Sequence, residues 1–100
     1  MYEHLVVFKF KMDVTAVKKQ EILDCLLAFP KQIPGILDIS AGFNVTEEIE
    51  NMHGYSLGLR VTFDDIASLR LYGPHPAHQE FVKSLDGMVE NVVVVDYPKI

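Results

Sequence analysis

The side chains in this sequence best suited to chemistry are two histidines and a tyrosine, His4, His78 and Tyr72. An imidazole can take up a proton near neutral pH, and a phenol can donate a hydrogen bond to a developing negative charge. His4 shares one face of a predicted strand with Val6 and Phe8, because alternate residues of a strand point the same way. These three polar groups are therefore candidates for general acid–base chemistry.

The spacing of apolar residues predicts where the three polar groups meet. His78 lies on the apolar stripe of a predicted helix, followed by Phe81, Val82 and Leu85 at the spacing of one helix face. Tyr72 ends the preceding helix. We expect both imidazoles and the phenol to face one apolar layer between a sheet and its helices. Buried polar groups need partners, so these groups either bond one another or face a cavity.

Each candidate also has a purely structural interpretation. His4 could be a core histidine that bonds a backbone carbonyl, and Tyr72 could bury its ring and keep its hydroxyl in water. A functional role is favoured for His78, because a position on a helix stripe is usually occupied by an aliphatic residue.

The remaining histidines do not predict a metal centre. His75 and His78 are three residues apart, but no third ligand is signalled nearby, so we expect no metal and no cofactor. His75 precedes Pro76 and is expected to cap a helix or form a turn. His53 lies in an acidic loop and is expected to be solvated.

Cys25 is the only cysteine, so no disulfide can form within the chain. It occurs among Ile22, Leu26 and Phe29 at helical spacing, which predicts a buried and inert thiol rather than a nucleophile.

Length and composition limit the classes of protein. One hundred residues, 49% of them hydrophobic, predict a single domain over residues 1–100. A net charge of −5 argues against a nucleic-acid partner, which would need a positive patch. No segment is apolar for long enough to cross a membrane, and the first residues lack the basic start of a signal peptide. These features favour a cytoplasmic protein.

The hydrophobic patterning predicts an α+β chain of the order β-α-β-β-α-α-β, which is the ferredoxin-like arrangement of helices on one antiparallel sheet. The predicted strands are residues 4–10, 37–45, 55–63 and 92–95. The predicted helices are residues 15–29, a short helix capped by Asp64 or Asp65 and ending near residue 72, and residues 76–85.

Strand phase also predicts a partner surface. Val6, Phe8, Ile39, Leu59, Val92 and Val94 would face the helices, whereas Leu5, Val7, Val93, Val95 and Tyr97 would lie on the opposite face. Leaving the second set in water would cost about 25 cal/mol per Å² of apolar surface. We therefore expect an identical chain to cover it, giving a homodimer with two packed sheets.

The sequence resembles the stress-responsive dimeric α/β-barrel family over essentially its whole length. The resemblance is carried by the opening residues 3–11, the central residues 54–63, the element Tyr72-Gly-Pro-His-Pro-Ala-His78 with the following Phe81, and the closing residues 92–97. It implies a ferredoxin-like protomer that pairs sheet to sheet in a homodimer. Many family members are small stress-associated proteins without an assigned activity.

The family also includes a cofactor-free aldol cyclase, whose general-base histidine matches His78, whose active-site tyrosine matches Tyr72 and whose first-strand histidine matches His4. Its aromatic pocket walls are replaced here by Ile22, Leu23, Leu26 and Val89, and its tryptophan by Ala41, so its substrate does not carry over.

Three hypotheses for function follow. The first is a dimeric stress-response barrel protein that binds a small apolar or carbonyl-bearing ligand. The second is a cofactor-independent, polyketide-cyclase-like enzyme with His78 as general base, Tyr72 as hydrogen-bond donor and His4 as an orienting group. A cofactor-free monooxygenase or isomerase rests on shared architecture alone. The residues predicted to contact the ligand are Val6, Phe8, Leu23, Leu27, Ile39, Leu59, Phe81, Val89, Val92 and Val94.

Overall fold

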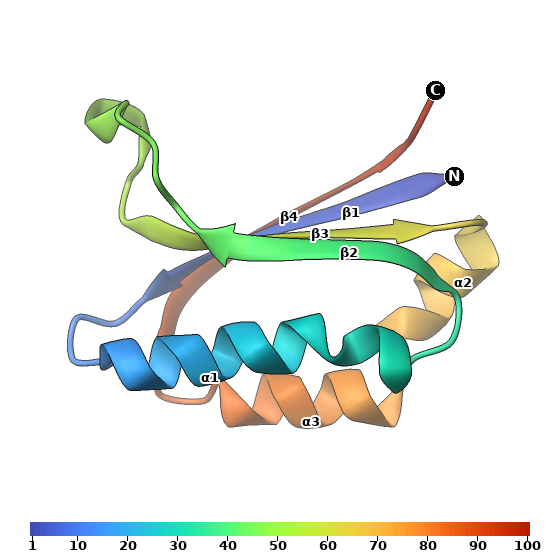
Figure 1. Ribbon diagram of the computed structural model, residues 1–100, viewed down its shortest axis with the longest axis horizontal. Helices are drawn as coiled ribbons and strands as arrows, with labels where there is room; N and C mark the ends of the chain where they lie inside the picture. Colours follow the sequence, from blue (N-terminus) through green and yellow to red (C-terminus); the bar gives the residue numbers. More distant parts are fainter.

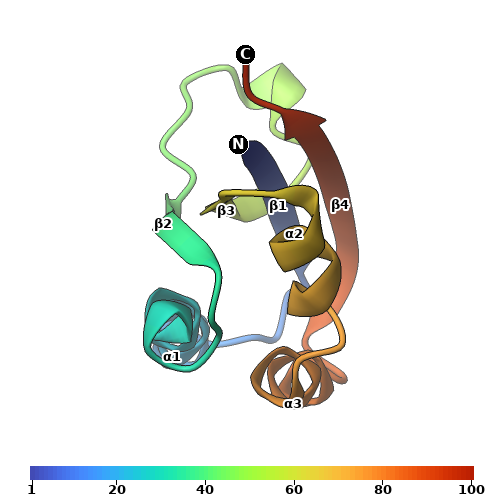
Figure 2. The same ribbon diagram turned by 90° about the vertical axis from the view of Figure 1, so that its right-hand side faces the viewer.

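The computed structural model describes all residues from 1 to 100 and has the predicted α+β, ferredoxin-like architecture. A four-stranded antiparallel sheet has the strand order β2-β3-β1-β4. The three α-helices cover one face of this sheet, which leaves the other face without a layer of α-helices above it (Figures 1 and 2). In chain order the elements are β1 (Tyr2–Phe10), α1 (Ala16–Leu27), η1 (Phe29–Lys31), β2 (Ile36–Phe43), η2 (Ile49–Asn51), β3 (Tyr55–Phe63), α2 (Ile66–Tyr72), α3 (Pro76–Ser84) and β4 (Val89–Pro98).

The three helices begin where side chains can satisfy their free N–H groups. Thr15 caps α1 by accepting the Lys18 N–H at 3.2 Å, and Asp65 caps α2 by accepting the Ser68 N–H at 2.8 Å. The hydrogen bond from the Ser68 backbone lowers the pKa of the Asp65 carboxyl. His75 accepts the Ala77 N–H through Nδ1, which confirms its predicted role as a cap. These caps position α2 and α3, which carry most of the polar groups of interest.

The core lies between the sheet and the helices. β3 contributes Leu57, Leu59, Val61 and Phe63, which alternate as predicted and are all buried. The largest fully buried side chains are those of Phe29, Phe63, Leu26, Leu57 and Val61. Phe29 stands at the centre of the aromatic packing, with the rings of Tyr72, Phe81 and His78 at centroid distances of 5.9, 5.3 and 6.2 Å.

Two predictions about individual side chains are wrong. Cys25 is exposed, because the buried stripe of α1 runs through Ile22, Leu23 and Leu26 and leaves Cys25 at its edge, towards α3. Leu37 begins the predicted strand 37–45, whose alternation places it on the same apolar face as Ile39. It is exposed, because the pairing of β2 with β3 shifts between Ile36 and Asp38, and Ile36 packs against the core instead.

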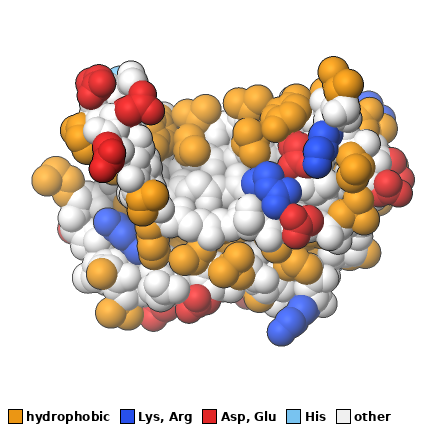
Figure 3. Space-filling view, turned by 45° about the horizontal axis from the view of Figure 1, so that its top comes forward, with side chains coloured by type: hydrophobic (Ala, Val, Ile, Leu, Met, Phe, Trp, Pro, Cys, Tyr) orange, Lys and Arg blue, Asp and Glu red, His pale blue; other side chains and the backbone are white.

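The face of the sheet turned away from the helices, called the outer face below, is apolar over much of its area. Val7, Val93, Val95 and Tyr97 are all large exposed side chains on this face. Figure 3 shows the outer face hollowed along its middle, with hydrophobic side chains on either side of a band of backbone and small residues. This apolar surface agrees with the prediction from strand phase.

One end of the outer face carries a charged network that the sequence did not suggest. Glu3 is almost fully buried, and its carboxylate accepts a hydrogen bond from Thr62 at 2.8 Å and from Arg60 at 3.4 Å. Arg60 also donates to Asp38 at 2.6 Å, and this bond lowers the pKa of the Asp38 carboxyl. These partners offset the cost of burying the Glu3 charge.

Candidate functional site

A cavity of about 300 Å³ lies between the sheet and α3. Apart from two histidines, its walls are aromatic or aliphatic, so it can hold an apolar body and offers few polar contacts. The residues that line it are His4, Val6, Phe8, Leu26, Leu59, Tyr72, His78, Phe81, Val82, Leu85, Val92 and Val94.

The predicted convergence of the three polar groups is confirmed. The ring of Tyr72 lies between the two imidazoles, with its centroid 4.6 Å from that of His78 and 5.3 Å from that of His4. His4 reaches this point from β1, Tyr72 from the end of α2 and His78 from α3. Burial of Tyr72 raises the pKa of its phenol, which therefore stays protonated near neutral pH and can donate a hydrogen bond.

The hydrogen bond made by His78 fixes which of its nitrogens is free. Its Nδ1 lies 3.1 Å from the backbone carbonyl oxygen of Gly73, which can only accept, so Nδ1 must carry the proton. In the neutral ring Nε2 then keeps an unshared electron pair. Burial lowers the pKa of His78, the bond to Gly73 opposes this shift, and the nearby His4 lowers it further. His78 is thus held neutral and able to act as a base.

The lowered pKa of His78 predicts how stability changes with pH. The unfolded chain takes up a proton on this residue near pH 6.5, whereas the folded chain takes it up only at a lower pH. The contribution of His78 to stability is therefore fully present above pH 6.5 and declines as the pH falls towards its folded pKa. An NMR titration should place the His78 midpoint below the ordinary histidine value of 6.5, and an equal or higher midpoint would contradict this assignment.

His4 has a partner that the sequence analysis missed. Its Nδ1 lies 2.5 Å from a carboxylate oxygen of Asp96, the residue directly opposite His4 in the β1–β4 pairing. Asp96 therefore orients the ring and can balance a positive charge on it, leaving Nε2 as the other available nitrogen. Extending the alternation of Val92 and Val94 by one more step would have placed Asp96 on the cavity face.

The apolar lining agrees with the prediction only in part. Of the ten predicted contact residues, Val6, Phe8, Leu59, Phe81, Val92 and Val94 line the cavity, whereas Leu23, Leu27, Ile39 and Val89 do not. Leu27 is exposed because it follows Leu26 around the helix by about 100°. Leu23 is buried in the core, and Ile39 and Val89 pack against the core elsewhere. Leu26, which the family resemblance placed in the pocket wall, lines the cavity, and Val82 and Leu85 are lining residues that the prediction omitted.

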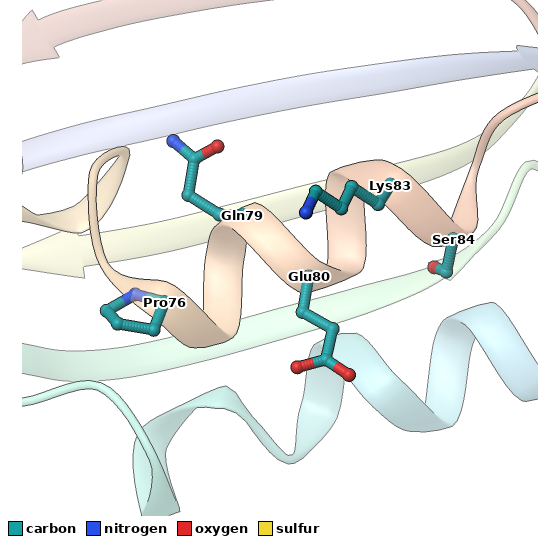
Figure 4. A pocket seen from close by; sticks show the side chains of 5 residues that line it. All are labelled: Pro76, Gln79, Glu80, Lys83 and Ser84. Atoms are coloured by element: carbon teal, nitrogen blue, oxygen red, sulfur yellow. The ribbon is translucent and has the colours of Figure 1, made fainter.

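Other depressions in the surface lack these features. One of about 600 Å³ lies over the solvent side of α3 and is lined by Pro76, Gln79, Glu80, Lys83 and Ser84, none of which is a large apolar residue (Figure 4). The smaller cavity holds the convergent polar groups.

Between α1 and α3, partial burial and the charge of Glu80 raise the pKa of the Cys25 thiol, which keeps it protonated.

No three side chains among the histidines, aspartates, glutamates and the cysteine are grouped as a metal site would require. None of the helices combines the length and the apolar character needed to cross a bilayer.

Comparisons with known proteins agree with the observed fold. Olivetolic acid cyclase of Cannabis sativa is 30% identical over 95 residues, which cover 95% of this chain and 93% of the cyclase. The crystal structure of At3g17210 from Arabidopsis thaliana is 26% identical, with a TM-score of 0.90, and the match covers 100% of this chain and 96% of that one. A protein from Bacteroides fragilis, described as dimeric and ferredoxin-like, is 26% identical, with a TM-score of 0.80, and the match covers 98% and 95% of the two chains.

The model of one protein family matches nearly the whole chain. It is that of the stress-responsive A/B barrel domain, and it matches residues 2–99. The chain therefore belongs to the stress-responsive A/B barrel domain family.

Proposed function

We propose that each subunit of a homodimer binds a small carbonyl compound with an apolar body in the cavity between the sheet and α3. The observation that carries this proposal is the grouping of Tyr72, His78 and His4 at one part of an otherwise apolar cavity. The protonated hydroxyl of Tyr72 is suited to donate a hydrogen bond to a carbonyl oxygen. The aliphatic and aromatic walls would hold the rest of the ligand by burying its apolar surface.

Sheet-to-sheet pairing is the second part of the proposal. Val93, Val95 and Tyr97 are each between 41% and 51% exposed in the single chain. A second sheet packed on the outer face would remove this apolar surface from water. The similarity to the Bacteroides fragilis protein, which is described as dimeric, supports the same arrangement.

A second candidate function is cofactor-independent aldol chemistry, and the free Nε2 of His78 is the observation that favours it. His78 would remove a proton from a carbon between two carbonyl groups, and Tyr72 would donate a hydrogen bond to the enolate oxygen. The enolate carbon would then form a bond to another carbonyl carbon of the same molecule, whose oxygen would take a proton. The similarity to olivetolic acid cyclase supports this class of reaction.

The binding proposal can be tested by titrating the protein with benzoylacetone, a β-diketone that carries a phenyl ring, and following the histidine and tyrosine NMR signals. Val94 and Val17 provide a matched pair, because both are exposed valines, at 51% and 69%, but only Val94 lines the cavity, and Val17 on α1 lies away from the outer face. Val94→Trp should weaken binding by about tenfold or more, since the indole would occupy the space of the ligand. Val17→Trp should leave binding nearly unchanged. Equal affinities for the two variants would place the ligand outside this cavity.

A further inference from the structure

The segment between β2 and β3, residues 44–54, rises from the sheet on the side away from the helices (Figures 1 and 2). We call this segment the arm. Its base and turns are held by hydrogen bonds of its own: Asn44 Nδ2 donates to the Tyr55 carbonyl oxygen at 2.8 Å, and the Thr46 N–H donates to Asn44 at 2.9 Å. The Glu48 N–H donates to the Thr46 hydroxyl at 3.1 Å. The arm is therefore pre-organised rather than dependent on contacts with the rest of its chain.

This ordered arm presents apolar side chains to solvent. Val45 is 91% exposed and Ile49 is 68% exposed. Since neither residue packs against its own chain, burial in the single subunit does not explain them. Exposed apolar side chains on a pre-organised protrusion are the usual form of a contact element, because little conformational entropy is lost when they bind.

The surface beside the arm is hollow. A depression of about 450 Å³ crosses the outer face, and its floor includes Gly42 and Gly58, which pair across β2 and β3. A Cβ atom at either glycine would meet nothing within 4 Å, so the hollow is open above both positions. Figure 3 shows the arm at the upper left rising beside this hollow. A protrusion and a recess on one face are the two halves of a contact that two identical chains can make reciprocally.

The charges decide how two copies can be oriented. Glu47, Glu48 and Glu50 give the arm three carboxylates, and no lysine or arginine lies within it. A twofold axis along the strands would bring both arms to the same end of the dimer and gather six carboxylates there, which like-charge repulsion opposes. A twofold axis across the strands turns the partner end for end. It keeps the two acidic arms apart and places each at the end of the partner's sheet that holds Lys99 and Arg60, where Arg60 is paired with Glu3 and Asp38.

We infer that the arm clasps a second copy of this chain, with Val45 and Ile49 buried against the end of the partner's outer face. This inference rests on the sheet-to-sheet homodimer of the proposed function and adds the element that fixes its orientation. The outer face and the arm then make separate contributions to the stability of the dimer.

Sedimentation velocity over a range of concentrations tests the inference on the full chain. The double variant Val45→Asp/Ile49→Asp should raise the dimer dissociation constant by about 100-fold, because two buried apolar side chains are lost on each of two symmetric arms. The control is Val17→Asp/Leu71→Asp, since these helix residues are 69% and 71% exposed but lie away from the outer face. It should dimerise as the wild type does. Circular dichroism should show that all variants are folded.

The inference about the arm and the proposal of a homodimer can be contradicted separately. If Val93→Asp dissociates the dimer while the arm variant dimerises like the control, the homodimer stands and the arm has no part in it. If the wild-type chain is monomeric at all concentrations, both the arm contact and the homodimer are wrong.

Discussion

Replacing His78 by alanine is expected to lower the rate of any aldol reaction in the cavity by about 10²–10⁴-fold, the usual contribution of a general base. The substitution removes the free Nε2 and leaves the binding surface formed by β1 and β4 intact. Binding of benzoylacetone should therefore change much less than turnover. The measurement is the first-order rate of cyclisation of a linear polyketide analogue at saturating concentration, followed by absorbance.

His53→Ala is the matched control for His78→Ala, since it also removes an imidazole but from an exposed position outside the cavity. It should react at the wild-type rate. A second variant, Tyr72→Phe, keeps the aromatic ring and removes only the hydroxyl that would bond the enolate oxygen. If His78→Ala retained the wild-type rate, His78 would have no role as a base. The aldol mechanism would then be wrong even if the ligand still bound.

Phe29→Ala is expected to lower the free energy of unfolding by about 3–5 kcal/mol, the usual cost of emptying a fully buried aromatic position. Phe29 is 0% exposed, and its ring contacts those of Tyr72, Phe81 and His78. The loss is large compared with the about 5–15 kcal/mol that stabilises a typical domain. Urea unfolding at one fixed protein concentration measures it, because the proposed dimerisation would make apparent stability depend on concentration.

The control for Phe29→Ala is Leu71→Ala, which also shortens an apolar side chain but at a position that is 71% exposed. Its effect should stay within about 0.5 kcal/mol. Comparable losses for the two variants would show that Phe29 does not hold the layers together. The milder Phe29→Leu variant should remain folded, so its affinity for benzoylacetone can also be measured. We expect this affinity to be lower than that of the wild type, because the packing around Tyr72 and His78 becomes looser.

The fold and the meeting of the polar groups could be predicted because both depend on the phase of regular elements. Once His4 shares a strand face with Val6, and His78 a helix stripe with Phe81, the layered packing of sheet and helices brings the two imidazoles to the same layer. Strand phase similarly predicted an apolar outer face. These predictions needed only local periodicity, which a single sequence carries.

The errors arose where the structure departs from regular periodicity or where contacts join distant residues. The shift in pairing at Asp38 turns Leu37 outward, and a pattern of alternating residues contains no signal for such a shift. Cys25 has the spacing of a buried residue but lies at the edge of the stripe formed by Ile22, Leu23 and Leu26, so it is exposed. The partnership of Glu3 with Thr62 and Arg60 depends on strand register, which composition does not give.

The central position of β1 has a consequence for how members of this family can diverge. Its even-numbered residues His4, Val6 and Phe8 face the cavity, while Leu5 and Val7 between them lie on the side proposed for assembly. Substitution of an even-numbered residue of β1 can therefore change ligand recognition without altering the dimer contact. Substitution of an odd-numbered residue can change the dimer contact without altering ligand recognition. A single-residue insertion within β1 would exchange the two sets and damage both properties together. The arm, which lies outside the regular pairing, is free to change in length on its own.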